Sequence, residues 1–461
     1  MNIPHINYHV MKDPVHGTMQ FTDIEDRWIK PFIDSPAFQR LRHIKQLGMG
    51  DYIFPGAVHT RFNHCIGCCY VASQIAQKIG LAEEERQLVM IACLLHDMGH
   101  GPFSHAFEDL FHQRLIRHED WTPYFLAEYR TDAFFQSYNQ HNPRHHLTED
   151  KFHEIESMIM HRSTGKRVLA DIVSSQLDAD RLDYLLRDSH FCGVAYGEFD
   201  FRWMLNSMKI IETPQGERLG LTHKGIGVVE HYLMARRLMV RNIYHHQKKL
   251  AFEYFLVQLL ESLAKHLAET PIFADICGTP LGQFLLAVNQ FNQTAKNKSD
   301  TTKLRETFLQ KYYPLYRELC DYDVFALIRQ LAHMNHDHEI IQLAKRLHLR
   351  QMPMILRLEP SDLEQAEAQV KTFRKQQAKK HFPWQMALIK TPHLSYSIDA
   401  DPILIENECH MVRRLEDISV IIQAISHHAE HTTFLCIDSE MVDEKSVQEM
   451  IRTLTKEHVT S

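Results

Sequence analysis

The sequence predicts a mainly α-helical core followed by a small α/β region. Helical periodicity runs through most of the chain to about residue 350, and one β-hairpin over 208–222 interrupts it. From Trp384 onward, short strand-like runs alternate with helices. We therefore expect a helical core with a helical extension over 1–355. A small α/β domain is expected over 356–461, after an exposed helix.

Local signals justify the elements in order. Ser35 as N-cap and Pro36 as first helical residue predict a helix that ends near Gly48. Mixed polar composition predicts that residues 112–150 form an irregular helical insertion over the site, and that residues 292–303 form a polar linker or an exposed loop. Other helical stretches are expected over 61–78, 83–107 with a turn inside, 171–190, 226–266, 304–350 and 361–380. The C-terminal region is expected to hold strands over 387–399 and 432–438 and helices over 416–428 and 444–456.

Composition excludes several classes of protein. Hydrophobic residues make up 44% and charged residues 24%, as in ordinary globular proteins, and no apolar run is long enough to span a bilayer. The N-terminus lacks the pattern of a secretory signal. Nine cysteines are scattered along the chain. Cys65 and Cys68 form a CxxC without a second pair at zinc-site spacing, so we expect both to be buried thiols, which fits a cytoplasmic protein. A net charge of −7 does not favour non-specific nucleic-acid binding, although local basic patches stay open.

The stretch LVMIACLLHDMGHGPFSHAF, Leu88 to Phe107, carries the strongest sign of a site. The apolar run to Leu95 reads as a buried helix that ends on His96 and Asp97. Glycines then break the helix, and His100 and His105 follow on the turn and the next helix. With 33 histidines in the chain, a spaced histidine pair alone means little. Polar groups at the end of a buried helix, however, need a compensating partner, and a cation is suitable.

Two further segments complete the candidate site. Asp180, Tyr184 and Asp188 are spaced four residues apart and line one stripe of a helix, which favours a ligand-facing stripe over a solvated face. His64 follows Arg61 on the face of another helix. His64, His96, Asp97 and Asp180 together suit a divalent Mn, Fe, Ni, Zn or Mg ion, and metal-assisted phosphoester hydrolysis is the chemistry that such a site supports. The candidate proton donors are His100, His105 and His153.

The strings RFNH, HDMGHGPFSH and DADRLDYLLRD resemble the HD-domain superfamily. More narrowly, they resemble its deoxynucleoside triphosphate (dNTP) triphosphohydrolases, both the bacterial enzymes and the vertebrate protein with a sterile-alpha-motif and an HD domain. The resemblance covers roughly residues 8–260 and includes DPVHG, FQRLRHIKQLG and FPGAVHTRF. It implies an HD-domain helical core that converts a dNTP to a deoxynucleoside and inorganic tripolyphosphate.

The resemblance also implies roles for individual residues. The metal ligands match His64, His96, Asp97 and Asp180. His105 matches the proton donor to the nucleoside 5′ oxygen, supported by His100, His153 and Glu108, where the family often has Asp. Gln46 and Asp188 match residues that hold the sugar 3′ hydroxyl, and Leu47 and Tyr244 match residues that close over C2′. Arg61, Arg181 and Arg236 match phosphate-binding cations, and Tyr184 lines the sugar.

The resemblance also extends to residues that regulate the vertebrate protein. Asp34, Gln39 and Arg42 match guanine-effector residues of the vertebrate protein, which implies a GTP or dNTP effector and a homo-oligomer, a dimer or a tetramer. Read without the resemblance, cations and amides on this helix are usually a solvated face. Lys12, Trp203 and Val240 depart from the effector and substrate residues of that protein. Two alternatives stay open: a phosphohydrolase of another nucleotide or of single-stranded nucleic-acid ends, and a nucleotide-binding regulator.

Overall fold

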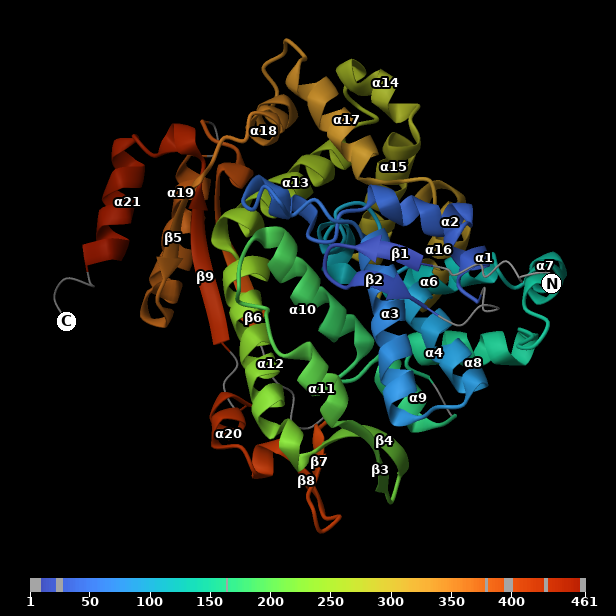
Figure 1. Ribbon diagram of the computed structural model, residues 1–461. Helices are drawn as coiled ribbons and strands as arrows, with labels where there is room; N and C mark the ends of the chain where they lie inside the picture. Colours follow the sequence, from blue (N-terminus) through green and yellow to red (C-terminus); the bar gives the residue numbers. More distant parts are fainter. Residues whose placement is uncertain are drawn as a thin grey trace.

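The computed structural model describes residues 10–21, 28–162, 165–377, 380–393, 401–426 and 430–456. It confirms the predicted fold class, a mainly helical body with small sheets. In Figure 1 the helices form one large body, and a three-stranded sheet with its covering helices lies along one side of it. Helix α21 (Lys445–Lys456) lies beyond this sheet, away from the helical body (Figure 1).

Three helices at the centre of the body position the candidate site. Helix α3 (Arg61–Ile79) packs against both α4 (Glu83–Leu95) and α10 (Ala179–Cys192). The crossing of α3 and α10 is close at Gly67, where an added Cβ would lie 2.0 Å from a carboxylate oxygen of Asp183. The apolar run of α4 is buried, as its composition predicts. Glycine therefore lets α10 bring its acidic residues against α3.

The other helices surround these three. Ser35 is the N-cap of α2 as predicted, because its hydroxyl accepts from the amide of Phe38. The α-helices are α1 (Lys30–Ile33), α2 (Pro36–Gln39), α5 (His105–Glu108), α6 (His118–Ala127), α7 (Asp132–His141), α8 (Glu149–Ile159), α9 (Arg167–Val173), α11 (Phe201–Ser207), α12 (Ile226–Met239), α13 (Gln247–His266), α14 (Ala274–Cys277), α15 (Pro280–Ala295), α16 (Thr302–Tyr316), α17 (Asp321–Ala332) and α18 (Glu339–His348).

Several predicted boundaries are wrong. The helix expected to reach Gly48 ends at Gln39 and continues as separate 3₁₀ turns over Arg40–His43 and Gly48–Tyr52. The linker expected over 292–303 is short, because α15 runs on to Ala295 and α16 begins at Thr302. The stretch over 226–266 is not one helix, since a π-helical turn over Val240–Tyr244 separates α12 from α13. Tertiary packing decides such ends, and local sequence signals them weakly.

The β structure forms three small sheets. Strands β1 (Val10–Asp13) and β2 (Gly17–Gln20) form a hairpin. The predicted hairpin over 208–222 is confirmed as β3 (Met208–Thr213) and β4 (Gly216–Thr222). The structure adds β7 (Leu404–Glu406) parallel to β4 and β8 (Val412–Arg414) beyond it. The third sheet has β9 (Glu430–Ile437) between β5 (Met354–Leu358) and β6 (Met386–His393), all antiparallel.

A large apolar core runs through the helical body, and a second, smaller core lies in the C-terminal region. The smaller core packs the β5–β9–β6 sheet against α19 (Leu363–Gln376) and α21 (Lys445–Lys456), which agrees with the expected α/β region. Segment 401–426, with β7, β8 and α20 (Val420–Ser426), instead packs beside the β3–β4 hairpin.

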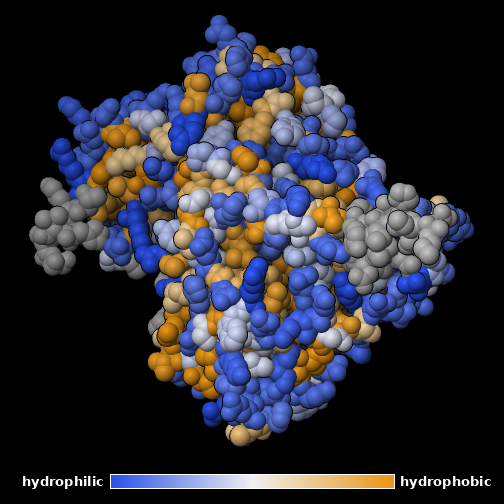
Figure 2. Space-filling view, in the orientation of Figure 1, coloured by the Kyte–Doolittle hydropathy of each residue, from blue (hydrophilic) through white to orange (hydrophobic). Residues whose placement is uncertain are grey.

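The face shown in Figure 2 is largely hydrophilic, with scattered hydrophobic side chains. Two of the most exposed apolar side chains, Val420 and Ile421, lie at the start of α20. Among the described residues, no single helix is both long and apolar enough to cross a membrane. Only the bent pair Pro271–Cys277 and Pro280–Ala295, at 107° to each other, meets the length and hydropathy test together.

Candidate metal centre and active site

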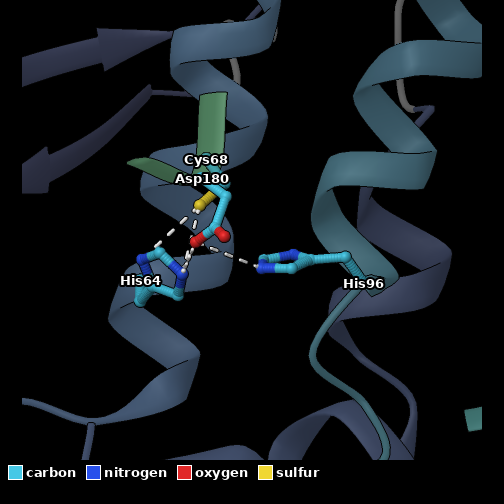
Figure 3. Close-up of side chains that lie close together, drawn as sticks. All are labelled: His64, Cys68, His96 and Asp180. Carbon is cyan, nitrogen blue, oxygen red and sulfur yellow. Dashed lines mark hydrogen bonds and ion pairs between the residues drawn. The ribbon is translucent and has the colours of Figure 1, made fainter. Parts of the chain in front are cut away.

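The four predicted metal ligands come together from three separate segments. His64 lies on α3, His96 and Asp97 follow the end of α4, and Asp180 begins α10. Asp180 Oδ1 lies 3.0 Å from His64 Nε2 and 3.6 Å from His96 Nε2. Figure 3 shows the two imidazoles facing the Asp180 carboxylate from different sides.

His64 is held between two carboxylates. Its Nδ1 donates to Asp183 at 2.8 Å, and its Nε2 faces Asp180. Burial disfavours charge on the ring, but the hydrogen bonds with Asp180 and Asp183 outweigh burial and raise the pKa of His64 to about 10. The two carboxylates therefore favour a positive charge on or beside the His64 ring. A divalent ion bound to Nε2 can supply that charge instead of the proton.

Asp183 has an orienting role that the sequence analysis missed. Besides His64, it accepts hydrogen bonds from His16 at 2.7 Å and from Arg187 at 2.8 and 2.9 Å, and it is fully buried. A carboxylate behind a metal-binding histidine fixes the ring orientation and leaves the other nitrogen for the metal. The sequence offered a sign of this role, because Asp183 lies one helical turn after the predicted ligand Asp180 on the same helix.

His96 supports the same reading. Its Nδ1 donates to the carbonyl of Cys93 at 2.8 Å, so Nε2 carries the lone pair. That Nε2 is buried and has no hydrogen-bond partner. A buried acceptor without a partner is costly unless an unseen group satisfies it. The donor set of imidazoles and carboxylates therefore fits a divalent ion held by His64, His96, Asp97 and Asp180.

Asp97 lies between this group and a second one. One of its oxygens forms an ion pair with Arg61 and lies 3.8 Å from His64 Nε2. The other lies 3.5 Å from His96 and 3.3 Å from His100. Burial disfavours the Asp97 charge, yet Arg61 and the neighbouring imidazoles hold the pKa of this carboxyl well below its usual range.

The second group contains His100, His105, Glu108 and His118. The rings of His100 and His118 stack at 3.7 Å. Glu108 accepts from His118 Nδ1 at 2.6 Å and faces His105 Nδ1 at 3.4 Å. These hydrogen bonds outweigh the burial of Glu108 and lower the pKa of its carboxyl. The His105 side chain is 66% exposed, so its other nitrogen can reach a substrate.

His118 is the second residue that the sequence analysis missed. His153 lies on α8 with an exposed side chain, and it belongs to neither ligand group among the described residues. His118 begins α6, inside the segment that was predicted to be an irregular helical insertion over the site. Its neighbours in the sequence, Arg117, Glu119 and Asp120, look like an ordinary charged surface.

Beyond the metal ligands, α10 leads to a third set of polar residues. Tyr244, in the π-helical turn, donates its hydroxyl to Asp188 at 2.8 Å. His59 Nε2 contacts the other oxygen of Asp188 at 2.7 Å, a partner that was not predicted. The ring of Tyr184 lies between this set and the metal ligands, 5.9 Å from Tyr244 and 6.5 Å from His64.

Gln46 and Leu47 precede the second 3₁₀ turn. The backbone amide of Gln46 donates to the carbonyl of His59, so Gln46 lies next to the residue that contacts Asp188. Its side-chain oxygen is buried without a hydrogen-bond partner. Because it lacks a partner, the side-chain oxygen of Gln46 is available to a bound molecule. Leu47, the next residue, is buried in the main core.

The three predicted phosphate-binding arginines already have partners. Arg61 donates to Ser104 at 2.9 Å in addition to its pairing with Asp97. Arg181 pairs with Asp178, and Arg236 donates to the side-chain oxygen of Gln176 at 2.9 Å. The predicted effector residues lie on the surface formed by α1, α2 and the following turn. There Arg42 donates to Gln39 at 2.7 Å, and Asp34 pairs with Lys30.

Comparison with known proteins agrees with this geometry. The family model of the HD domain matches residues 61–188, the segment that carries all four predicted metal ligands. The uncharacterized protein YwfO of Bacillus subtilis is 35% identical over 257 residues, which cover 54% of this chain and 55% of that protein. The human deoxynucleoside triphosphate triphosphohydrolase SAMHD1 is 31% identical over 271 residues, covering 52% of this chain and 42% of that protein. Thus the matches span about half the length of these curated relatives.

Solved structures share the fold over nearly the whole chain. A phosphohydrolase of Bacteroides thetaiotaomicron superposes with a TM-score of 0.71 at 24% identity, covering 94% of this chain and all of that one. A hypothetical protein of Aquifex aeolicus gives a TM-score of 0.67 at 22% identity, over 96% of this chain and all of that one. The HD-domain match, the similarity to these relatives and the gathered histidine and aspartate ligands show that this chain contains an HD domain over residues 61–188.

Proposed function

We propose that this protein hydrolyses deoxynucleoside triphosphates to a deoxynucleoside and inorganic tripolyphosphate. The observation that carries the proposal is the position of Asp97. Its carboxylate lies beside the metal ligands His64 and His96 and also beside His100 of the second group. A phosphoester bond that lies beside the metal ligands would therefore also lie beside His105 and Glu108. The similarity to enzymes named as deoxynucleoside triphosphate triphosphohydrolases supports this choice of substrate.

The roles of the chain's own residues follow from their contacts. A divalent ion held by His64, His96, Asp97 and Asp180 would supply an acidified water and polarise the α-phosphate. Glu108 holds Nδ1 of His105, so the exposed Nε2 can give its proton to the departing 5′ oxygen.

The sugar end is assigned to the residues around Asp188. The Asp188 carboxylate accepts from Tyr244 and contacts His59, and it can accept a further hydrogen bond from a 3′ hydroxyl, as can the side-chain oxygen of Gln46. Tyr244 and Leu47 would close over C2′ and exclude a ribose. Arg61, Arg181 and Arg236 would exchange their present partners for phosphate oxygens.

The test is a product assay with purified protein. Each dNTP and each ribonucleotide is incubated with Mn²⁺ or Mg²⁺, with and without GTP, and tripolyphosphate and free nucleoside are measured. We expect both products from dNTPs, and neither in the Asp97→Ala variant. Dependence on GTP would support an effector site at Asp34, Gln39 and Arg42. Cleavage of ribonucleotides or nucleic-acid ends alone would favour another phosphohydrolase. Metal binding without any cleavage would leave a nucleotide-binding regulator.

A further inference from the structure

A basic cavity lies where the π-helical turn and the start of α13 meet the β5–β9–β6 sheet. Its volume is about 470 Å³, an ordinary size for a ligand pocket. The sheet packs against α13 along the side of the helical body (Figure 1). No carboxylate lines the cavity among the described residues. The side chains that carry the argument are Arg241, His245 and His246 from the helical body and Arg357, Thr432 and Phe434 from the sheet.

Arg241 and Arg357 line this cavity without a partner for their charge. Neither guanidinium group forms a hydrogen bond or an ion pair with any residue that the structure describes. By contrast, Arg218, which lines a cavity at the β3–β4 hairpin, pairs with Asp171 and Asp401. Guanidinium groups with free donors in a concave site suit phosphate oxygens, which they can bind in pairs. The cavity therefore carries positive charge that the described residues do not compensate.

The strand register explains why Arg357 faces the helical body. Side chains alternate between the two faces along β5, and Ile355, two residues before Arg357, packs against the main core. Arg357 lies on that same face, opposite Phe434 of β9. The other face, which includes Leu356 and Leu435, forms the smaller core with α19 and α21. A cation thus continues an otherwise apolar face at the place where this face meets the π-helical turn.

The start of α13 adds a third positive feature. This helix has 20 residues, its N-cap His246 forms no side-chain hydrogen bond to the first turn, and that turn contains no acidic residue. The amides of the first turn therefore keep a partial positive charge that favours an anion. His246 also lines the cavity, and its Nδ1 is buried without a hydrogen-bond partner. The two arginines, the helix end and this nitrogen all belong to one cavity.

The lining favours a chain of phosphate groups over a nucleobase. Phe434 is the only apolar side chain among the described residues that line the cavity, whereas pockets for organic rings are lined mainly by apolar and aromatic groups. Arg241 and Arg357 come from different elements, so each can bind a different part of one anion. An anion with several linked phosphates meets this requirement better than a single phosphate does.

We propose that this cavity binds an inorganic oligophosphate, which Arg241 and Arg357 hold between the π-helical turn and β5. The bound anion links the turn to the sheet. Tyr244 lies in the same turn, and its hydroxyl donates to Asp188 at 2.8 Å. The ligand therefore holds Tyr244 against the sugar side of the active site. Inorganic tripolyphosphate is the product of the proposed reaction, so its role as the natural ligand rests on the proposed function, whereas the binding chemistry does not.

The test titrates inorganic tripolyphosphate into the full-length, metal-free protein by calorimetry. We expect a site whose affinity falls about tenfold to a hundredfold in Arg241→Gln and in Arg357→Gln, the loss typical of a hydrogen bond between charged groups. Arg329→Gln is the matched control, because Arg329 is an exposed arginine on α17 outside the cavity, and it should bind as the wild type does. Arg241 and Arg357 are exposed as well, so both variants should fold.

Hydrogen exchange measures the link to the π-helical turn without any hydrolysis. At a tripolyphosphate concentration of about 100 times its Kd, amide exchange that requires release of the ligand should slow by up to about a hundredfold. We expect this protection over Val240–Tyr244 in the wild type and in Arg329→Gln, and not in Arg357→Gln. An equal exchange rate of this segment with and without tripolyphosphate would contradict the link to Tyr244.

The remaining outcomes separate the sources of the phosphates. Equal affinity for tripolyphosphate in the wild type and both cavity variants, or an equal loss in Arg329→Gln, would overturn the proposal. GTP or a dNTP that binds through Arg241 and Arg357 while tripolyphosphate does not bind would also overturn it, because the cavity would then select a nucleotide. Absence of dNTP hydrolysis would instead refute the proposed function, and the calorimetry would still decide whether the cavity binds an oligophosphate.

Discussion

Replacing His118 by alanine should slow hydrolysis while replacing His153 should not. His118 Nδ1 donates to Glu108 at 2.6 Å, and its ring stacks on His100 at 3.7 Å. A hydrogen bond to a charged group contributes about 1.5–3 kcal/mol, and this bond orients the carboxylate that also faces His105. If that energy is lost from the transition state, kcat falls about tenfold to a hundredfold. His153 is exposed on α8 and belongs to neither ligand group among the residues that the structure describes.

The assay measures tripolyphosphate release from a dNTP with Mn²⁺ over a range of pH. His118→Ala should lower kcat with little change in KM, because the Glu108 carboxylate that faces Nδ1 of His105 then loses the hydrogen bond that orients it. His118→Asn keeps a donor and should recover part of the rate. His153→Ala serves as the matched control. Equal losses in folded His118→Ala and His153→Ala, or full activity in both, would refute the assignment of His118 as a positioning residue.

Three further perturbations follow from the structure. Asp183→Asn removes the charged partner of His64 and should weaken Mn²⁺ binding about tenfold to a hundredfold by calorimetry; unchanged affinity would contradict its orienting role. Tyr244→Phe removes the hydroxyl donor to Asp188 and should raise KM for dNTPs about fivefold to tenfold. The aromatic ring remains and should still exclude ribonucleotides, which competition assays can check. Burial raises the pKa of Asp321 from 3.8 to about 6, although hydrogen bonds from two backbone amides act in the opposite direction. The folded state therefore holds the carboxyl proton of Asp321 more tightly than the unfolded state does. Its contribution to stability is therefore complete below about pH 4 and is lost as pH rises through about 6. Relative to Asp321→Asn, the wild type should lose about 2–3 kcal/mol of unfolding free energy between pH 4 and 7, and a difference independent of pH would contradict this.

The sequence was most informative where the pattern that forms a helix also shows which of its residues are buried or face the site. The apolar run of α4 has to be buried, and its terminal His96 and Asp97 stand out because polar groups rarely end such a run. The stripe on α10 is visible for the same reason, since Asp180, Tyr184 and Asp188 recur at helical spacing. These patterns were sufficient to predict the mainly helical fold and the meeting of α3, α4 and α10.

Residues whose roles depend only on tertiary contacts were not predictable. His118 and His153 both sit among polar neighbours, and with 33 histidines in the chain only packing shows which one reaches Glu108. The pairing of Leu221 in β4 with Ile405 in β7 joins strands far apart in sequence, and no local signal specifies such a partner.

The π-helical turn over Val240–Tyr244 has a consequence for how substrate preference can evolve. A π-turn holds one residue more than an α-turn, so deleting a single residue here would turn the end of α12 into regular α-helix, with His245 and the extended His246 still separating it from α13. Each residue of an α-helix turns the chain by about 100°. Tyr244 would then rotate away from Asp188 while every other residue of the sugar side kept its identity. One change in chain length would thus move the whole Tyr244 side chain away from Asp188, an alteration that no single replacement of a side chain reproduces.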